Sequence, residues 1–141
     1  MIGRLEIQPR DRILLLSIPD VSLIFDLAAR VPEGLIAGLG TEEEVCEVRR
    51  VCRGLDNVMF LLAAPDEVPW RERFFTKVLD PRGVWERPEL VVREIARLLA
   101  PGGLVLAAEP ARSALLGAGF VELAPGGQLG RMDDAAGIQA R

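Results

Sequence analysis

Short apolar segments alternate with amphipathic segments along most of the chain, and this alternation constrains the fold more than any other feature. The first apolar run, residues 12–18 (RILLLSI), is followed by residues 20–31, in which Leu23, Leu27 and Val31 recur every four positions. A short continuous apolar run is typical of a strand buried on both faces, and a four-residue spacing is typical of one helix face. The first 31 residues therefore predict a strand followed by a helix.

The same alternation continues to residue 124, and it predicts a doubly wound, mostly parallel, Rossmann-like α/β sheet of about six to seven strands with helices on both faces. Thr41 and Glu44 have the spacing of a capping box at the start of a helix, and Pro88 suits a first helical turn. Further strands are expected at 34–40, 57–64, 74–80, 103–108, 120–124 and, more briefly, within 125–131, and further helices at 41–55, 88–101 and 109–119.

Composition limits the classes of function that the chain can perform. The 141 residues suit one domain, with a core over about 11–125 and a partly frayed segment over 126–141. Net charge is −4 with no basic block, so nucleic-acid binding is not expected. No apolar run approaches the roughly 20 residues that span a bilayer, so a cytoplasmic protein without membrane contact is expected. Half of the residues are hydrophobic, which suits either a well-filled sheet or an apolar surface that forms a homodimer or covers a protein partner.

The chemistry available to the side chains is also limited, because the chain contains neither histidine nor tyrosine. The commonest general base and the commonest transition-metal ligand are therefore missing. Cys46 and Cys52 lie six residues apart on one expected helix, so they point in different directions and are expected to be free thiols. No metal site is expected.

In a sheet of this kind, ligands usually bind outside the carboxyl ends of the strands. The residues that the sequence brings to those ends are Asp20, Thr41, the 65–67 loop, Asp80 and Glu109. This set follows from topology and from no binding motif.

In the second half of the chain, residues 64–70 (APDEVPW) are followed by the expected strand FFTKVLD and then by residues 89–108 (ELVVREIARLLAPGGLVLAA). This order of loop, strand, helix and strand, with its Pro-Gly-Gly junction, resembles the class I S-adenosylmethionine-dependent methyltransferases. Residues 117–123 (GAGFVEL) resemble the segment before the family's sixth strand. The resemblance covers about residues 11–125 and implies a single, truncated methyltransferase-like domain over 1–141.

The positions that hold the cofactor in this family carry other residues here. The turn after the first strand reads LLLSIPD where the family has a glycine-rich motif, and glycine is what lets backbone approach the ligand. Where the family has the acid that binds the ribose, the resemblance places Leu39. Where the family has the acid near the adenine, it places Ala64. Each lost partner costs on the order of 1–3 kcal/mol, against about 8 kcal/mol for micromolar affinity. The expected function is therefore a pseudoenzyme: a structural or interaction module that binds no cofactor in the usual way.

The alternative is an active methyltransferase with a divergent pocket for S-adenosylmethionine and an unknown small-molecule substrate. Its candidate cofactor-binding residues are Ser17, Ile18, Asp20, Thr41, Asp66 and Glu67, and Asp80 is the candidate base or orienting group. An Asp before Pro at a strand end is also an ordinary turn residue. A third reading is a small anionic ligand at the helix start of Thr41–Glu44, against which the three glutamates there argue.

Overall fold

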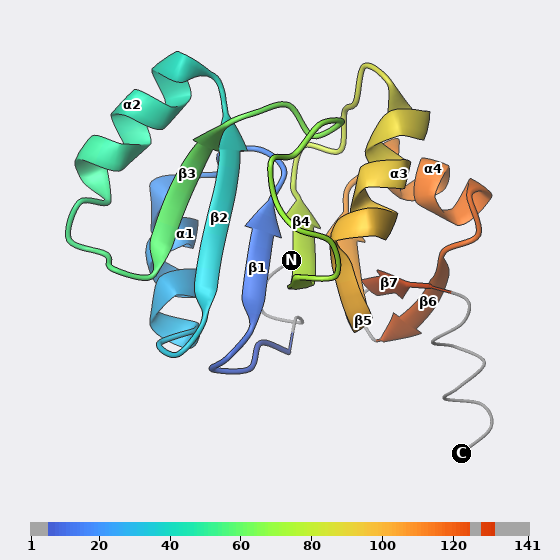
Figure 1. Cartoon of the computed structure of the whole chain (residues 1–141), viewed down its shortest axis with the longest axis horizontal. Coiled ribbons are helices and arrows are strands. Elements are labelled where there is room, and N and C mark those ends of the chain that lie inside the picture. Colours follow the sequence, from blue (N-terminus) through green and yellow to red (C-terminus); the bar gives the residue numbers. More distant parts are fainter. Residues whose placement is uncertain (1–5, 125–127, 132–141) are drawn as a thin grey trace.

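The computed structural model describes residues 6–124 and 128–131, which form a seven-stranded sheet with helices on both faces (Figure 1). The strands are β1 (Arg12–Leu15), β2 (Leu35–Gly40), β3 (Val58–Leu62), β4 (Phe75–Asp80), β5 (Leu99–Ala107), β6 (Val121–Ala124) and β7 (Gln128–Gly130). The helices of the described part are α1 (Val21–Arg30), α2 (Glu42–Val51), α3 (Pro88–Leu98) and α4 (Ala111–Gly117). The predicted α/β class and strand number are confirmed.

The sheet has the strand order β3-β2-β1-β4-β5-β7-β6. The pairs β1–β2, β1–β4, β2–β3 and β4–β5 are parallel, whereas β7 runs antiparallel to both of its neighbours. The chain winds outward in one direction from β1 and in the other from β4, so the strand order reverses between these two. That reversal is the topological switch point, where sheets of this class bind ligands.

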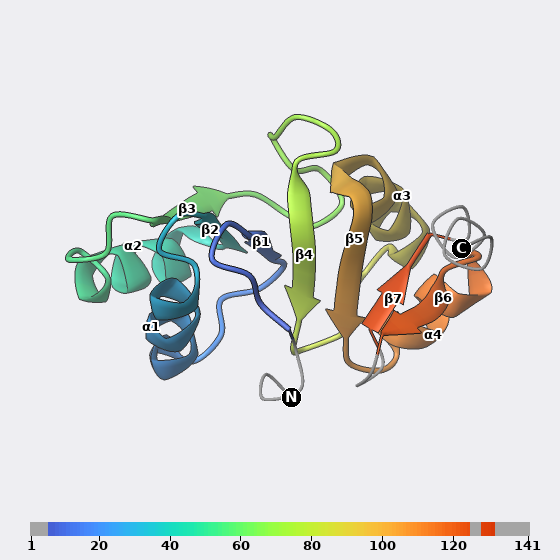
Figure 2. The same ribbon diagram turned by 90° about the horizontal axis from the view of Figure 1, so that it is seen from below.

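Each face of the sheet has its own hydrophobic core. Ile24 and Leu27 of α1 and Val45 and Val48 of α2 pack in one cluster, whereas α3 and α4 contribute to a second cluster that contains Ile95. Figure 2 shows α1 and α2 on one side of the sheet and α3 on the other. This arrangement confirms the predicted double winding. Cys46 is exposed and Cys52 is buried, and both are free thiols as expected.

The helix starts follow the sequence signals to different degrees. Thr41 caps α2, because its Oγ1 accepts the Glu44 N–H while the Glu44 carboxylate accepts the Thr41 N–H at 3.0 Å, so the predicted capping box is confirmed. Pro88 opens α3 as predicted. Asp20 precedes α1 without a side-chain cap; its carboxylate instead accepts the Ser22 hydroxyl at 2.9 Å.

The end of α3 differs from the sequence prediction. The helix was expected to reach residue 101 and to stop at a Pro-Gly-Gly turn, but it ends at Leu98, and β5 begins at the next residue. Leu99 pairs with Phe75 and Leu104 pairs with Lys77, so residues 100–103 form an irregularity within the strand. Leu99, which continues the apolar pattern of the helix in sequence, therefore belongs to β5 and pairs with β4.

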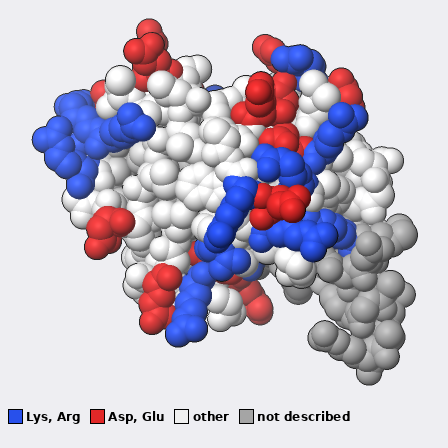
Figure 3. Space-filling view, in the orientation of Figure 1, with Lys and Arg blue, Asp and Glu red and all other residues white. Residues whose placement is uncertain are grey.

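No helix connects β3 to β4, and residues 63–74 cross the α3 side of the sheet as a loop (Figure 1). Arg97 and Glu94 of α3 hold this loop. The Arg97 guanidinium donates to the carbonyls of Val68 and Trp70, and the Glu94 carboxylate accepts the Val68 N–H at 2.8 Å. The α3 side of β2 and β3 carries no helix, and Figure 3 shows a broad stretch over these strands without Lys, Arg, Asp or Glu.

The structure describes part of the C-terminal segment for which fraying was expected. Residues 128–130 form β7, which confirms the short additional strand, whereas 132–141 lie outside the described residues. Within the described part of the chain, no helix is both long and apolar enough to cross a bilayer.

Candidate functional site

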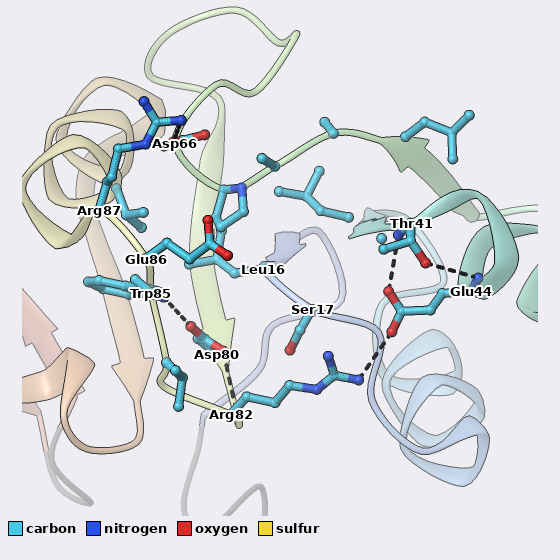
Figure 4. Close-up of a pocket in the computed structure, with 18 of the residues that line it drawn as sticks. Leu16, Ser17, Thr41, Glu44, Asp66, Asp80, Arg82, Trp85, Glu86 and Arg87 are labelled. Atoms are coloured by element: carbon cyan, nitrogen blue, oxygen red, sulfur yellow. Dashed lines mark hydrogen bonds and ion pairs between the residues drawn. The ribbon is translucent and has the colours of Figure 1, made fainter.

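A cavity of about 660 Å³ lies at the carboxyl ends of β1, β2, β3 and β4, at the switch point of the sheet (Figure 4). Its walls come from the turn after β1, the start of α2, the loop after β3 and the loop from β4 to α3. The volume is in the usual range for a small-molecule site. Topology alone therefore located the cavity.

The turn after β1 directs its side chains to different places. Ser17 lines the cavity, and its Oγ is buried and has no hydrogen-bond partner within the described structure. Ile18 packs against the α1 and α2 core instead, above the two glycines of β2. A Cβ added at Gly40 would lie 2.8 Å from Ile18 Cγ1, and one at Gly38 would lie 3.2 Å from Cδ1. The glycines of β2 therefore give Ile18 its space.

The end of β2 and the start of α2 contribute apolar and polar groups to the cavity. Leu39 lines it and is 1% exposed, as part of the core on the α3 side. Thr41 lines it from the N-cap of α2, and Glu42 and Glu44 line it from the first turn of that helix. Glu44 accepts a hydrogen bond from the backbone of Thr41 and pairs with Arg82 at 3.1 Å, and these contacts hold the pKa of Glu44 below its usual value. The Arg82–Glu44 pair joins α2 to the loop after β4.

The loop after β3 brings Ala64 and Asp66 to the cavity. Asp66 is 15% exposed at its side chain and pairs with Arg87 at 3.2 Å, which ties this loop to the start of α3. Glu67 does not line the cavity; its N–H donates to the Ala64 carbonyl in a tight turn. The two predicted acids of this loop therefore lie in different environments.

Asp80 lies at the bottom of the cavity, 2% exposed. Its Oδ1 accepts the N–H groups of Arg82 and Gly83 at 3.2 and 3.1 Å, and its Oδ2 accepts the Trp85 Nε1–H at 2.5 Å. Gly83 has a φ of +66°, and a Cβ there would overlap the Ala108 carbonyl. The Asp80 carboxylate is thus occupied by its own turn, in agreement with the reading of Asp80 as a turn residue.

The structure brings together four of the seven candidate residues: Ser17, Thr41, Asp66 and Asp80 all line the cavity, whereas Ile18, Asp20 and Glu67 do not. Glu109, which topology also placed at a strand end, accepts the backbone N–H of Ser113 in α4 and lies outside the cavity. Among the described residues, no group of three or more His, Cys, Asp or Glu side chains is arranged to hold a metal ion.

The 82–87 loop supplies further cavity residues. Arg82, Glu86 and Arg87 all line the cavity, and Trp85 closes its side at 9% exposure. The arginines and tryptophans of the loops were visible in the sequence, but their pairing with Glu44 and Asp66 spans the fold. No local spacing signals such pairs.

No protein-family model matches the sequence, and no curated protein matches it either. Solved structures do match. The [4+2]-cyclase SpnF superposes with a TM-score of 0.72 at 20% identity, over 84% of this chain and 54% of that chain. A putative sarcosine dimethylglycine methyltransferase from Galdieria sulphuraria superposes with a TM-score of 0.70 at 17% identity, over 82% of this chain and 56% of that chain.

A third match is a chain from the complex between the Haloferax volcanii Trm112 methyltransferase activator and a putative methyltransferase, with a TM-score of 0.70 at 19% identity, over 84% of this chain and 64% of that chain. This protein spans about half the length of the first solved chains that it matches. The fold implied by residues 64–108 is therefore confirmed: the chain has the fold of the class I S-adenosylmethionine-dependent methyltransferases.

Proposed function

We propose that this methyltransferase-fold protein does not bind S-adenosylmethionine in the usual way and acts as a structural or interaction module. The observation that carries the proposal is the side chain of Leu39, which forms the cavity wall where the resemblance expects the acid that binds the ribose. Leu39 is 1% exposed and belongs to the core. Ribose hydroxyls set against it would lose their hydrogen bonds to water without replacement, at about 1–3 kcal/mol each.

The other two positions support the same proposal. The side chain of Ala64 offers no acceptor to an adenine amino group, and the turn of Ser17–Asp20 contains no glycine. Pro19 lacks a backbone N–H, and Ile18 anchors the turn to β2 through its contacts above Gly38 and Gly40. The residues present therefore do not fit the cofactor in the mode that the resemblance implies.

An interaction role is supported by exposed apolar surface. Met59 of β3 is 37% exposed, and Leu62 at the end of the strand is 58% exposed. Figure 3 shows a broad uncharged stretch over β2 and β3. The solved complex from Haloferax volcanii pairs a chain of this fold with an activator protein. We propose that this surface forms a homodimer or covers a protein partner, since clustered apolar surface marks such contacts.

The test is calorimetric titration of the folded protein with S-adenosylmethionine. We expect no heat of binding up to millimolar cofactor, and a dissociation constant below about 100 μM would overturn the proposal. Light scattering on the same sample tests the interaction role. A dimer or larger assembly supports it, whereas a monodisperse monomer counts against the homodimer and leaves only a different partner.

A second candidate function is an active S-adenosylmethionine-dependent methyltransferase with a divergent pocket. The observation in its favour is the cavity itself, about 660 Å³ at the switch point with Thr41 and Asp66 on its wall. In this reading Asp66 would meet the adenosine, whereas Asp20, the candidate for the amino-acid end of the cofactor, does not line the cavity. The same titration decides between the two, because only this candidate requires tight binding of the cofactor.

A further inference from the structure

The charges around the cavity are unbalanced. Five carboxylates and two guanidinium groups line it. Both arginines are already paired, Arg82 with Glu44 and Arg87 with Asp66. Asp80 accepts three hydrogen bonds from its own loop. Formal charges leave the lining negative, and an anionic ligand would be repelled from it.

This arrangement leaves two carboxylates available in the cavity: Glu42, in the first turn of α2, and Glu86. Glu86 is the one on the loop after β4. It has no hydrogen bond or ion pair within the described part of the chain, and in Figure 4 its side chain extends from the loop after β4 toward the middle of the cavity. Its two neighbours are fixed, since the Trp85 indole binds Asp80 and the Arg87 guanidinium binds Asp66. The Glu86 backbone is therefore held between two anchored side chains.

The wall around Glu86 is mostly apolar. Leu16, Leu39 and Val91 all line the cavity, and they belong to the same core cluster as Trp85. Leu62 and Val84 line the cavity and are 58% and 74% exposed. These side chains can cover an apolar body, and burying such a body is favourable at about 25 cal/mol per Å².

We propose that the cavity binds a small organic cation that carries an apolar body, such as an aryl or alkyl amine. The ammonium group pairs with Glu86, and the body packs on the wall formed by Leu16, Leu39 and Val91. This site goes beyond the structural role proposed above and requires no binding of S-adenosylmethionine.

Three indole compounds of similar size test the charge preference: tryptamine is a cation, indole-3-ethanol is neutral and indole-3-acetate is an anion. The ¹⁵N-labelled protein reports binding through its two indole N–H signals, because Trp85 lines the cavity and Trp70 does not. We expect tryptamine to shift the Trp85 signal and leave Trp70 unchanged. We expect its affinity to exceed that of indole-3-ethanol about tenfold, and indole-3-acetate to bind most weakly.

Glu86→Gln is expected to reduce the affinity for tryptamine about tenfold and to abolish the preference over indole-3-ethanol. Glu89→Gln is the matched control, because Glu89 is exposed in the first turn of α3 and outside the cavity.

The proposal is overturned if the Trp85 signal does not move at roughly 10 mM tryptamine, or if the three compounds bind equally. It is also overturned if Glu86→Gln binds tryptamine as the wild-type protein does. These outcomes are separable from the cofactor titration. Tight binding of S-adenosylmethionine would overturn the structural proposal and leave the preference for cations intact. Tryptamine titrations without a signal change would overturn the cation site and leave the structural proposal intact.

Discussion

The Nε1–H of Trp85 donates a 2.5 Å hydrogen bond to Oδ2 of Asp80, and both side chains are buried. The other carboxylate oxygen accepts two backbone N–H groups of the same loop. A carboxylate with both oxygens occupied is poorly placed to take a proton from a substrate. The pair instead fixes the loop that presents Glu86 to the cavity.

Replacing Asp80 by Ala is therefore expected to destabilise the fold. The buried indole N–H and two backbone N–H groups would lose their acceptor, and we expect the free energy of unfolding to fall by about 3 kcal/mol. Urea denaturation measures the change. Asp26→Ala is the control, because Asp26 makes only an exposed pair with Arg30 and should cost about 0.5 kcal/mol or less. Equal costs for the two variants would contradict the structural role of Asp80.

Much of the fold was predictable because it is written in local patterns. The strand 35–40 and the capped helix that begins after Thr41 follow from an apolar run and a capping box, which act within a few residues. The prediction for the end of α3 was wrong because a contact between distant segments decides it. Leu99 continues the helical pattern in sequence, yet its pairing with Phe75 of β4 decides its conformation. Pairing between distant strands is invisible to a local pattern.

The location of the site was predictable and its composition was not. Topology places any ligand at the carboxyl ends of the strands, and Thr41, Asp66 and Asp80 were found in this way. Arg82 and Glu44 are 38 residues apart in sequence and meet only in the folded chain. Glu86 is one of several exposed glutamates in the sequence, and only the folded chain places it at the cavity.

The contact between Ile18 and Gly40 predicts a coupled pair of substitutions. Gly40→Ala places a Cβ 2.8 Å from Ile18 Cγ1, so we expect a loss of about 1–3 kcal/mol in unfolding free energy from overpacking. Ile18→Ala removes the opposing atom. In the Ile18→Ala background, Gly40→Ala should lower the unfolding free energy by less than about 0.5 kcal/mol. A loss of that size is no larger than the usual deviation from additivity between independent sites. A double-mutant cycle by chemical denaturation measures the coupling, and additive costs would contradict the contact.

The lowered pKa of Glu44 predicts a dependence of stability on pH. Hydrogen bonding to the Thr41 backbone, aided by Arg82, favours the charged form of Glu44 in the folded protein. Because the folded pKa lies below the unfolded value of 4.5, the stabilisation is complete above that pH and is lost as the pH falls through the folded pKa.

Glu44→Gln keeps an acceptor for the capping box and removes the charge. We expect this variant to be less stable than wild type by about 0.5 kcal/mol at neutral pH and equally stable in acid. Thermal unfolding across the pH range measures the difference. Glu43→Gln removes one charge from the same helical turn without breaking the Thr41 or Arg82 contacts. A pH profile for Glu43→Gln identical to that of Glu44→Gln would show that net charge alone is responsible.

The final prediction concerns the loop that replaces a helix between β3 and β4. Arg97 donates to the carbonyls of Trp70 and Val68 at 2.8 and 2.9 Å and pairs with Glu94, so one planar guanidinium holds the loop to α3. Arg97→Ala should lower the unfolding free energy by about 2 kcal/mol, because two carbonyls and a carboxylate lose their partner. Arg97→Lys should recover less than half of that loss in unfolding free energy, since an ammonium cannot reach the three acceptors in one plane.

The control is Arg93→Ala, on the exposed side of the same helix, which should change the unfolding free energy by less than about 0.5 kcal/mol. Hydrogen exchange at the Val68 and Trp70 amides should accelerate in Arg97→Ala alone, and unchanged exchange there would show that the loop is held by its apolar contacts instead.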